Sequence, residues 1–417
     1  MIPENPDRRE TQHTVHDPLR ALAELFRIET VEISAFAQIS IAVPGAQLRR
    51  PPYPAAPYPA AACPEAGRVG MGSAPDARQS QLAALGEAVE LASCCVWGDE
   101  PILHLRATDL GPAAVPTGSI LGFSASQIAA RDAWNLRYGR HDWRPQQGVD
   151  PTDWIAAHEA MTGKTHFIAA DAVLIGRRDP GDPTAVAIAD SNGCAAGPTE
   201  PAAQAAALLE LIERDATGRW WHGRRRRPTL PLSVLPPDLA EWLLARDRRT
   251  SLLDITTDIG IPVVAALSHD PSGRTPALGF AARTTQAEAA LAAVREMLGV
   301  ETALPPWRDA LNDPLMAEWL AQGPDAMPPL GGAALPAAAT PPGDPLETCL
   351  AALDRLGLKV FIIDLTRKVF GVPVARAFVP GLCHYKPRHG HPRLLAQDAR
   401  DMPPIRRVGP NSLPLLV

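Results

Sequence analysis

Glutamates recur one helical turn apart in alanine-rich parts of this sequence. The stretch LLELIERDATGRWW, residues 208–221, carries Glu210, Glu213 and Arg214 among apolar residues. Residues spaced by three and four positions lie on one face of a helix, so the two carboxylates and the guanidinium would point the same way. Such a face could bind a metal ion or a phosphate, or it could simply be solvated.

Two further segments have a similar design. ALGEAVE carries Glu87 and Glu90, and AAVREML carries Glu296. Several inward-facing carboxylates are costly to bury unless positive charge lies among them. Mg²⁺ is usually held by carboxylates together with substrate phosphates, and an arginine such as Arg214 pairs with either group. One helix of this kind alone would favour a solvated face, but three of them in one chain indicate a metal–nucleotide site.

Three helices are expected to position these side chains, and each begins with a residue that can cap its first turn: 73–93 capped by Ser73, 199–218 capped by Thr199 and 285–299 capped by Thr285. Strands are expected at 31–43, 185–190, 261–268, 276–282, 359–365 and 372–379, and shorter helices at 315–321 and 346–357. This mixture predicts an α/β (α+β) fold with mixed sheets. The sequence contains no GxGxxG or GxxxxGK[ST] motif, so neither a Rossmann nor a P-loop site is expected.

The composition limits the class of protein. The chain has 417 residues, 45 of them proline, and a net charge of −6, which argues against a nucleic-acid binder. No run of about 18 apolar residues predicts a membrane span. The polar N-terminus and the lack of disulfide-framework cysteine spacing favour the cytoplasm. Residues 1–15 are expected to be a disordered tail, and proline-rich loops are expected near 49–64 and 322–345.

One loop gathers four residues of the types that bind zinc: Cys383, His384, His389 and His391. Their spacing, C-H-x4-H-x-H, matches no strong zinc pattern. We therefore expect no metal ion at this loop.

Several blocks of the sequence, in order, resemble the YcaO family. The first is GMGSAPDARQSQLAALGEAVE and the second is DSNGCAAGPTEPAAQAAALLELIERDA. DITTDIGIPVVAAL and PALGFAARTTQAEAALAAVREML form the third region, and DLTRKVFGVPVARAFVPGLCHYKPRHGHPRL forms the last. The blocks resemble those of YcaO-type cyclodehydratases, which make azoline- and azole-containing peptides. The resemblance covers most of the chain and implies one YcaO domain over residues 16–417.

The resemblance implies an enzyme that uses ATP and Mg²⁺ on a backbone amide of a ribosomal precursor peptide. A Cys, Ser or Thr side chain of the peptide attacks the preceding carbonyl, the resulting oxygen is phosphorylated from ATP, and elimination of phosphate leaves a thiazoline or oxazoline. Such chemistry requires positioning and charge neutralisation of the phosphoryl group.

The family's functional residues carry over position by position. The metal ligands implied by the resemblance are Glu87, Glu90, Glu210 and Glu213. The implied catalytic residues are Glu210, Glu213, Arg214 and the terminal Val417. The implied nucleotide-binding residues are Ser191, Asn192, Arg214 and Glu296.

The resemblance also implies partners. These are the precursor peptide, a separate leader-peptide-recognition protein and a flavin-dependent dehydrogenase. The sequence allows a homodimer, and neither nucleic acid nor a membrane is expected as a partner.

The sequence departs from the family pattern at several positions. Met71 stands where the family commonly has Lys, Leu91 replaces an Arg, and Gly299 replaces a Gln. The ending GPNSLPLLV lacks the full alternating prolines of many cyclodehydratases, whose terminal carboxylate lies in the active site. Two alternatives therefore stay open: a non-catalytic scaffold that binds peptide or nucleotide, and an enzyme that forms thioamides.

Overall fold

The structure is a computed structural model that describes residues 22–34, 36–45, 69–139, 142–146, 148–303, 330–333 and 343–396, together with residues 48, 319, 327, 328, 401 and 415. The tail expected at 1–15, the proline-rich loop at 49–64, most of the loop at 322–345 and most of the helix at 315–321 lie outside these residues. No helix in the described ranges is long and apolar enough to span a lipid bilayer.

The first of three sheets is antiparallel and covered by one helix. Its strands are β1 (Phe26–Ser34), β2 (Ala37–Pro44) and β3 (Gly70–Ala74), in that order, and α2 (Ala77–Cys94) packs against β3 and β2. The single strand expected at 31–43 is wrong, because the chain reverses within it. Ser34 Oγ accepts a hydrogen bond from the Phe36 N–H at 3.2 Å in the turn. Apolar alternation continues through this turn, so the pattern does not reveal it.

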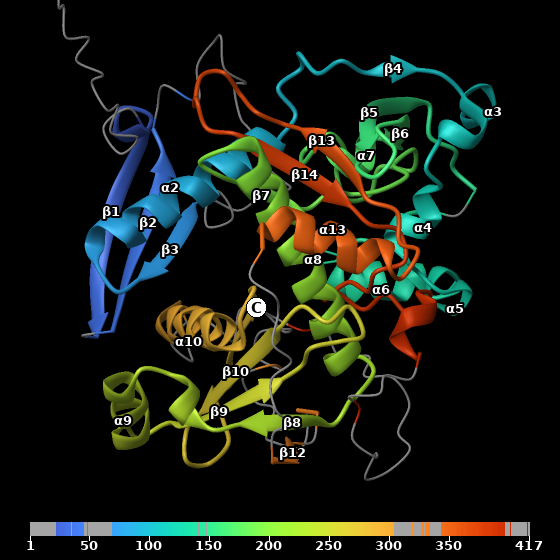
Figure 1. Ribbon diagram of the computed structural model, residues 1–417. Helices are drawn as coiled ribbons and strands as arrows, with labels where there is room; N and C mark the ends of the chain where they lie inside the picture. Colours follow the sequence, from blue (N-terminus) through green and yellow to red (C-terminus); the bar gives the residue numbers. More distant parts are fainter. Residues whose placement is uncertain are drawn as a thin grey trace, which may run out of the picture.

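The second sheet has the order β11-β10-β9-β8-β12. Its strands are β8 (Arg227–Leu230), β9 (Arg249–Asp254), β10 (Val263–His269), β11 (Ala277–Ala282) and β12 (Leu330–Ala333). Helix α10 (Gln286–Ala303) packs on β10 and β11, and α9 (Pro237–Ala245) packs on β9 (Figure 1). The strands expected at 261–268 and 276–282 are confirmed as β10 and β11, with a shift of one or two residues.

The third sheet has the order β4-β5-β13-β14-β7, with β6 paired to β5. Its strands are β4 (Leu103–His104), β5 (Asp153–Glu159), β6 (Thr165–Ala169), β7 (Cys194–Ala196), β13 (Phe361–Asp364) and β14 (Val374–Phe378). The strand expected at 185–190 is wrong. Ala185 and Val186 are buried as a strand would be, but the Val186 N–H bonds Asp171 Oδ2 at 3.3 Å instead of a neighbouring strand. The apolar run therefore forms a buried loop.

Short helices connect β4 to β5 and lie beside the third sheet (Figure 1). They are α3 (Ala107–Leu110), η3 (Gly111–Ala113), α4 (Thr117–Leu121), α5 (Ala125–Ala129) and α6 (Arg131–Tyr138), and α7 (Ala170–Val173) follows β6. The 3₁₀ helices η4 (Leu232–Val234) and η6 (Pro392–Leu394) complete the described elements outside the core.

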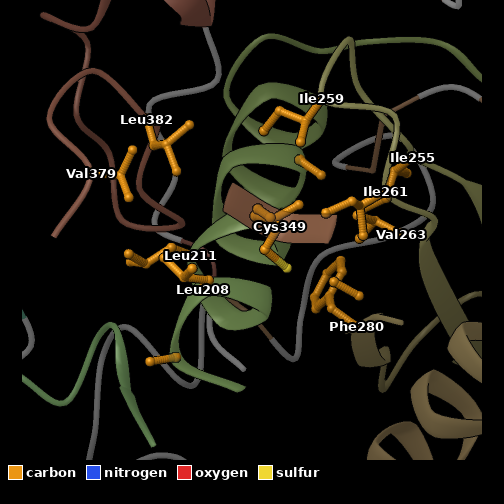
Figure 2. Close-up of a cluster of buried hydrophobic side chains, with 14 of the residues drawn as sticks. Leu208, Leu211, Ile255, Ile259, Ile261, Val263, Phe280, Cys349, Val379 and Leu382 are labelled. Carbon is orange, nitrogen blue, oxygen red and sulfur yellow. The ribbon is translucent and has the colours of Figure 1, made fainter. Parts of the chain in front are cut away.

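The long helix α8 (Glu200–Trp221) joins the second and third sheets, because it contacts both β11 and β14 and packs against α13 (Pro345–Asp354) (Figure 1). Leu208 and Leu211 of α8 lie in one apolar cluster with Phe280, Cys349 and Val379 (Figure 2). Helix α8 is thus buried between the layers and can hold side chains against both sheets.

The expected end of this helix at Gly218 is wrong, since α8 continues to Trp221. A Cβ at Gly218 would lie 2.3 Å from the His384 carbonyl oxygen. The glycine therefore allows the chain after β14 to approach the helix closely, rather than ending the helix. Trp220 and Trp221 are fully buried, as expected of core aromatics.

Candidate functional site

Helix α8 presents two carboxylates and a guanidinium on one face, as its spacing predicts. Arg214 Nε lies 3.6 Å from Glu210 Oε1, and Arg214 Nη1 lies 3.9 Å from Glu213 Oε1. The guanidinium carbon also lies 4.5 Å from the ring centroid of Tyr385. Both nitrogens are buried and make no hydrogen bond to any part of the chain that the structure describes. Arg214 therefore has N–H donors available for an oxygen-rich ligand.

Glu87 of α2 is fixed by the strand beneath its helix. The Met71 N–H of β3 donates to Glu87 Oε2 at 3.0 Å. Glu296 of α10 is fixed in the same manner, because the Phe280 N–H of β11 donates to Glu296 Oε2 at 2.7 Å. One strand in each of two sheets thus orients a carboxylate on the helix that covers the sheet.

Glu213 and Glu90 also accept backbone hydrogen bonds. The Ala282 N–H donates to Glu213 Oε2 at 3.3 Å, and Glu90 accepts a backbone hydrogen bond from Ala196. Arg214 acts electrostatically on Glu87 and Glu296 as well as on its own helix. The structure therefore brings carboxylates from α2, α8 and α10 around one arginine, as the sequence predicts.

Burial dominates the electrostatics of this group. It raises the pKa of Glu87 and Glu210 to about 7 and that of Glu296 to about 8. Burial also raises the pKa of Glu213, and it raises that of Glu90 well above its ordinary value with the help of the neighbouring Glu210. Arg214 opposes these shifts only in part. The five carboxylates therefore favour the arrival of additional positive charge.

The donor set fits Mg²⁺ in its chemistry, because all its members are carboxylate oxygens. Among the described residues, however, no three Asp, Glu, His or Cys side chains converge closely enough to form a ready-made metal cage. Mg²⁺ commonly takes only one or two carboxylates and completes its shell with water and substrate phosphates. The arrangement thus suits a metal ion that arrives with a phosphate ligand, rather than one held by protein alone.

Ser191 and Asn192 lie on the loop before β7, beside the carboxylates of α8. The Ser191 carbonyl accepts the Cys194 N–H at 2.8 Å, and Asp190 Oδ1 accepts the Asn192 N–H at 3.1 Å. Gly193 of the same loop makes a backbone hydrogen bond to Glu210. This loop therefore borders the carboxylate group directly.

Sequence reasoning did not find the partners of this loop. Lys386 Nζ lies 2.6 Å from Asp190 Oδ2, and His384 Nε2 lies 3.6 Å from the same oxygen. Although burial opposes ionisation, Lys386 and then His384 hold the pKa of Asp190 well below its usual range. Burial lowers the pKa of His384 to about 4, so its imidazole is neutral near pH 7. Both segments are present in the quoted sequence blocks, DSNG at 190–193 and HYK at 384–386, but no spacing rule links residues so far apart.

The loop with Cys383 and three histidines is tied to α8 by hydrogen bonds. The Cys383 N–H donates to Asp215 Oδ1 at 2.8 Å, and His391 is buried. Val417, expected at the active site as the terminal carboxylate, lies outside the described residues.

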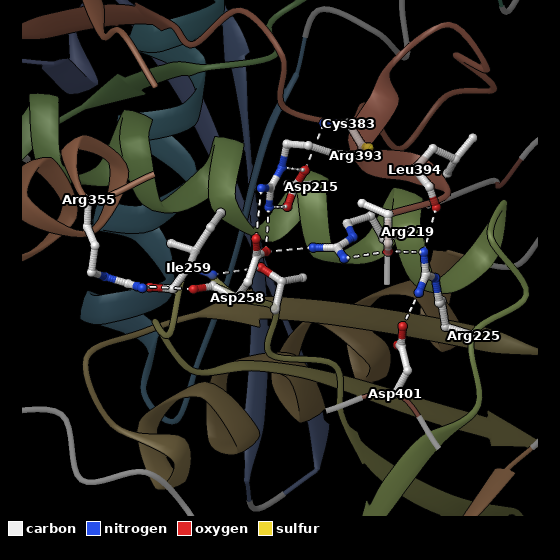
Figure 3. A network of polar contacts seen from close by, with 12 residues as sticks. Asp215, Arg219, Arg225, Asp258, Ile259, Arg355, Cys383, Arg393, Leu394 and Asp401 are labelled. Carbon is white, nitrogen blue, oxygen red and sulfur yellow. Dashed lines mark hydrogen bonds and ion pairs between the residues drawn. The ribbon is translucent and has the colours of Figure 1, made fainter. Parts of the chain in front are cut away.

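A polar network anchors this C-terminal loop to α8 and the turn that follows it (Figure 3). Arg393 Nη2 lies 2.9 Å from Asp215 Oδ2 and 2.7 Å from Asp258 Oδ1, and Arg219 Nη1 lies 2.7 Å from Asp258 Oδ1. Arg225 bonds the Leu394 carbonyl at 2.9 Å. Arg219 of α8 and Arg225 of the following turn therefore help to fix the loop that supplies His384 and Lys386.

A family model described as YcaO cyclodehydratase, ATP- and Mg²⁺-binding, matches residues 71–383 of this chain. An uncharacterised protein of Methanothermobacter thermautotrophicus is 30% identical over 253 residues, which are 55% of this chain and 65% of that protein. The range 71–383 matched by the family model includes every predicted site residue except Val417.

Three solved structures share the fold. A heterocyclase in complex with substrate and cofactor has a TM-score of 0.76 and 24% identity, over 90% of this chain and 54% of the other. The heterocyclase TruD has a TM-score of 0.65 and 27% identity, over 76% of this chain and 47% of TruD. YcaO from Methanopyrus kandleri, bound with AMPPCP and Mg²⁺, has a TM-score of 0.59 and 20% identity, over 88% and 90%. The chain thus spans about half the length of the two heterocyclases.

Proposed function

Because this chain belongs to the YcaO family of ATP- and Mg²⁺-binding cyclodehydratases, we propose that it is an ATP-dependent cyclodehydratase acting on backbone amides of a ribosomal precursor peptide. One observation carries the proposal: glutamates from α2, α8 and α10 gather around Arg214, whose Nε and Nη1 make no hydrogen bond within the described residues. Glu213 is buried, Glu90, Glu210 and Glu296 are partly buried, and Glu87 lies at the exposed edge of the group. Such a group is suited to a polyphosphate with its metal ions.

The proposed reaction places most of the demand on charge. A Cys, Ser or Thr side chain attacks the preceding carbonyl, the new oxygen takes a phosphoryl group from ATP, and loss of phosphate leaves a thiazoline or oxazoline. Mg²⁺, when bound, neutralises negative charge on the transferred phosphoryl group. The protein's own contribution is to hold the reacting groups in line and to exclude water.

Named residues divide this work. We propose the carboxylates of Glu87, Glu90, Glu210 and Glu213 as the metal ligands. Arg214 donates N–H groups to phosphate oxygens, a geometry that the planar guanidinium suits well. Glu296 lies beside Glu213 and supports the same charge arrangement. The loop with Ser191 and Asn192 closes the phosphate end of the nucleotide pocket, and Val417 would supply the terminal carboxylate.

Peptide recognition is assigned to a separate protein. The chain covers 54% of the heterocyclase that was solved with substrate and cofactor. We propose a leader-peptide-recognition partner that delivers the precursor peptide, followed by a flavin-dependent dehydrogenase that oxidises azolines to azoles.

The second candidate is a non-catalytic scaffold, and specific residues favour it. Met71 replaces the expected Lys, and its side chain is 39% exposed beside Glu87. Leu91 and Gly299 remove two further polar groups from the family pattern. Thioamide formation is a third outcome, in which the amide oxygen is exchanged for sulfur.

Mass spectrometry separates the three functions. Incubation of the chain with ATP, Mg²⁺, precursor peptide and partner should lighten the peptide by the mass of one water per ring. A gain in mass that matches the replacement of oxygen by sulfur indicates a thioamide. An unchanged peptide, in a reaction where the partner binds the leader normally, contradicts both enzymatic functions and leaves the scaffold.

A further inference from the structure

A cavity of about 80 Å³ lies beside the carboxylate group, between α4, the loop 187–192 and the chain from β14 to His384. Its walls include Ile120, Leu121, Val379 and Leu382, which are apolar. A single water needs only about 10–15 Å³ of such volume, so the cavity can hold several waters or a small organic group.

One buried hydrogen-bond acceptor at this cavity has no partner among the described residues. Asn192 lines the cavity, and its Oδ1 is buried without a hydrogen bond to any described residue. The loop around it is fixed, because the Asn192 N–H bonds Asp190 Oδ1 at 3.1 Å. A buried acceptor that is rigidly held and unsatisfied favours a ligand that carries an N–H or O–H donor.

One buried donor at the same cavity also lacks an acceptor in the described part of the chain. Arg376 lines the cavity and is 2% exposed. Its Nη1 donates to the Val173 carbonyl at 2.6 Å, and its guanidinium carbon lies 5.0 Å from the ring centroid of Phe378. Arg376 Nε, by contrast, has no acceptor within the described ranges of the chain. This N–H favours a ligand that carries a carbonyl oxygen.

The other charged side chains at the cavity are already neutralised. Asp190 pairs with Lys386 at 2.6 Å, and Arg388 pairs with Asp142 through two bonds of 2.7 and 2.5 Å. A fully ionised phosphate would satisfy Arg376 but would leave the Asn192 oxygen without a donor. An amide supplies one donor and one acceptor, and it tolerates apolar walls on both sides.

The cavity adjoins the carboxylates that the proposed function assigns to phosphoryl transfer. Leu211, which lines it, follows Glu210 on α8, and Gly193 bonds Glu210 from the same loop as Asn192. The amide oxygen that accepts a phosphoryl group must lie next to these carboxylates. The adenine base, in contrast, lies a triphosphate's length away from the transferred phosphorus.

We propose that this cavity binds the peptide group to be modified, with Asn192 Oδ1 accepting its N–H and Arg376 donating to its carbonyl oxygen. The assignment rests on the proposed function and adds the amide subsite to it. The walls at Ile120 and Leu382 then select a small or aliphatic side chain on the residue before the cyclised Cys, Ser or Thr.

Methyl NMR on the full-length chain tests this subsite. With Ile, Leu and Val methyls labelled, acetyl-glycyl-cysteine methylamide is titrated in the presence of Mg²⁺ and AMPPCP. The Ile120 and Leu382 signals are expected to shift, while those of Leu252 and Val264 in the second sheet stay in place. Asn192→Leu and Arg376→Lys should each weaken this binding about tenfold, and Ile120→Trp should abolish it by filling the cavity. Leu244→Ala, at an exposed position of α9, is the matched control.

Two outcomes overturn the inference. One is a shift of the Ile120 and Leu382 signals by adenosine alone, which makes the cavity a base pocket. The other is dipeptide binding that is absent, or equal in wild type and in all three cavity variants. Calorimetry measures the binding of Mg²⁺ and AMPPCP separately, and this binding tests the carboxylate group. Its loss contradicts the proposed function, whereas its retention without dipeptide binding contradicts the amide subsite alone.

Discussion

Glu87 and Glu296 each accept a hydrogen bond of the same kind, in two distant parts of the chain. In each, a strand N–H donates to the glutamate sixteen residues later, from Met71 at 3.0 Å and from Phe280 at 2.7 Å. Gly279 precedes Phe280, and a Cβ there would lie 2.2 Å from a backbone oxygen of α10. Gly70 stands in the same relation to α2. Two strand–helix units of one design therefore orient carboxylates toward Arg214 from two sides.

Close packing in these units gives a stability prediction. Gly70→Ala should lower the free energy of unfolding by about 1–3 kcal/mol, because its Cβ would meet Ala84 O at 2.2 Å and force α2 away from β3. Gly86→Ala lies within α2 with no atom within 4 Å of the new Cβ, and should raise stability by roughly 1 kcal/mol. Urea unfolding of both variants measures the contrast. A Gly70 variant as stable as wild type contradicts the packing argument.

The metal-ligand assignment predicts the effect of removing charge. Glu210→Gln and Glu213→Gln should each weaken Mg²⁺·ATP binding about tenfold or more and lower turnover about 100-fold. Glu241→Gln, on the exposed face of α9, is the matched control and should bind normally. Calorimetry gives the affinities. Equal binding by wild type and both variants would remove Glu210 and Glu213 from the site, and absence of binding in the wild type would exclude the enzyme.

The raised carboxyl pKa values predict how stability depends on pH. The folded protein without ligand has Glu87 and Glu210 with pKa values of about 7 and Glu296 with a value of about 8, above the 4.5 of an exposed glutamate. Between pH 4.5 and 8 the folded state therefore binds more protons than the unfolded state, and stability falls as pH rises through this window. The loss should amount to several kcal/mol, because each pKa unit corresponds to about 1.4 kcal/mol, and the exposed Glu87 should contribute least to it.

Urea unfolding across pH 5–8, with and without Mg²⁺ and AMPPCP, measures this dependence. Metal and nucleotide bind the ionised carboxylates, so they should flatten the slope. Glu296→Gln should also reduce it, since the amide does not titrate. A stability that rises with pH in the ligand-free protein would contradict the burial of these carboxylates.

Restoring one family residue gives a gain-of-function test. Met71→Lys should tighten ATP binding about fivefold, because it adds a positive charge at the edge of the carboxylate group, worth roughly 1 kcal/mol near a partly exposed position. The Met71 side chain is 39% exposed, so the substitution should leave stability unchanged. Leu82→Lys, at an exposed position of α2, supplies the control charge. Unchanged affinity in Met71→Lys indicates that the lost lysine made no phosphate contact here.

Local signals in the sequence predicted the three helices that carry the site, but the start of α2 and the ends of α8 and α10 differ from the expected bounds. Thr199 caps α8, and Thr285 with Glu288 forms the capping contacts of α10, as expected. The expected cap at Ser73 is wrong, because Ser73 belongs to β3 and Asp76 caps α2. A polar residue before a helix can act as its N-cap only when its own backbone is not paired within a sheet.

The candidate site was predictable where its members share a helix. Glu210, Glu213 and Arg214 follow from helical spacing alone. The pairing of Asp190 with Lys386 joins segments nearly two hundred residues apart, and the free Arg376 donor depends on burial between layers. Such relationships arise from tertiary packing, which periodicity does not encode.

Helix α8 is fastened on two opposite sides by consecutive residues. Glu213 and Arg214 belong to the carboxylate group, while Asp215 is tied to Arg393 and to the Cys383 N–H. Neighbouring residues lie about 100° apart around a helix, so any axial rotation that carried Glu213 toward a ligand would pull Asp215 out of its bonds. The helix therefore cannot rotate about its axis when a ligand binds. Metal and phosphate must approach these carboxylates, and only side-chain torsions adjust.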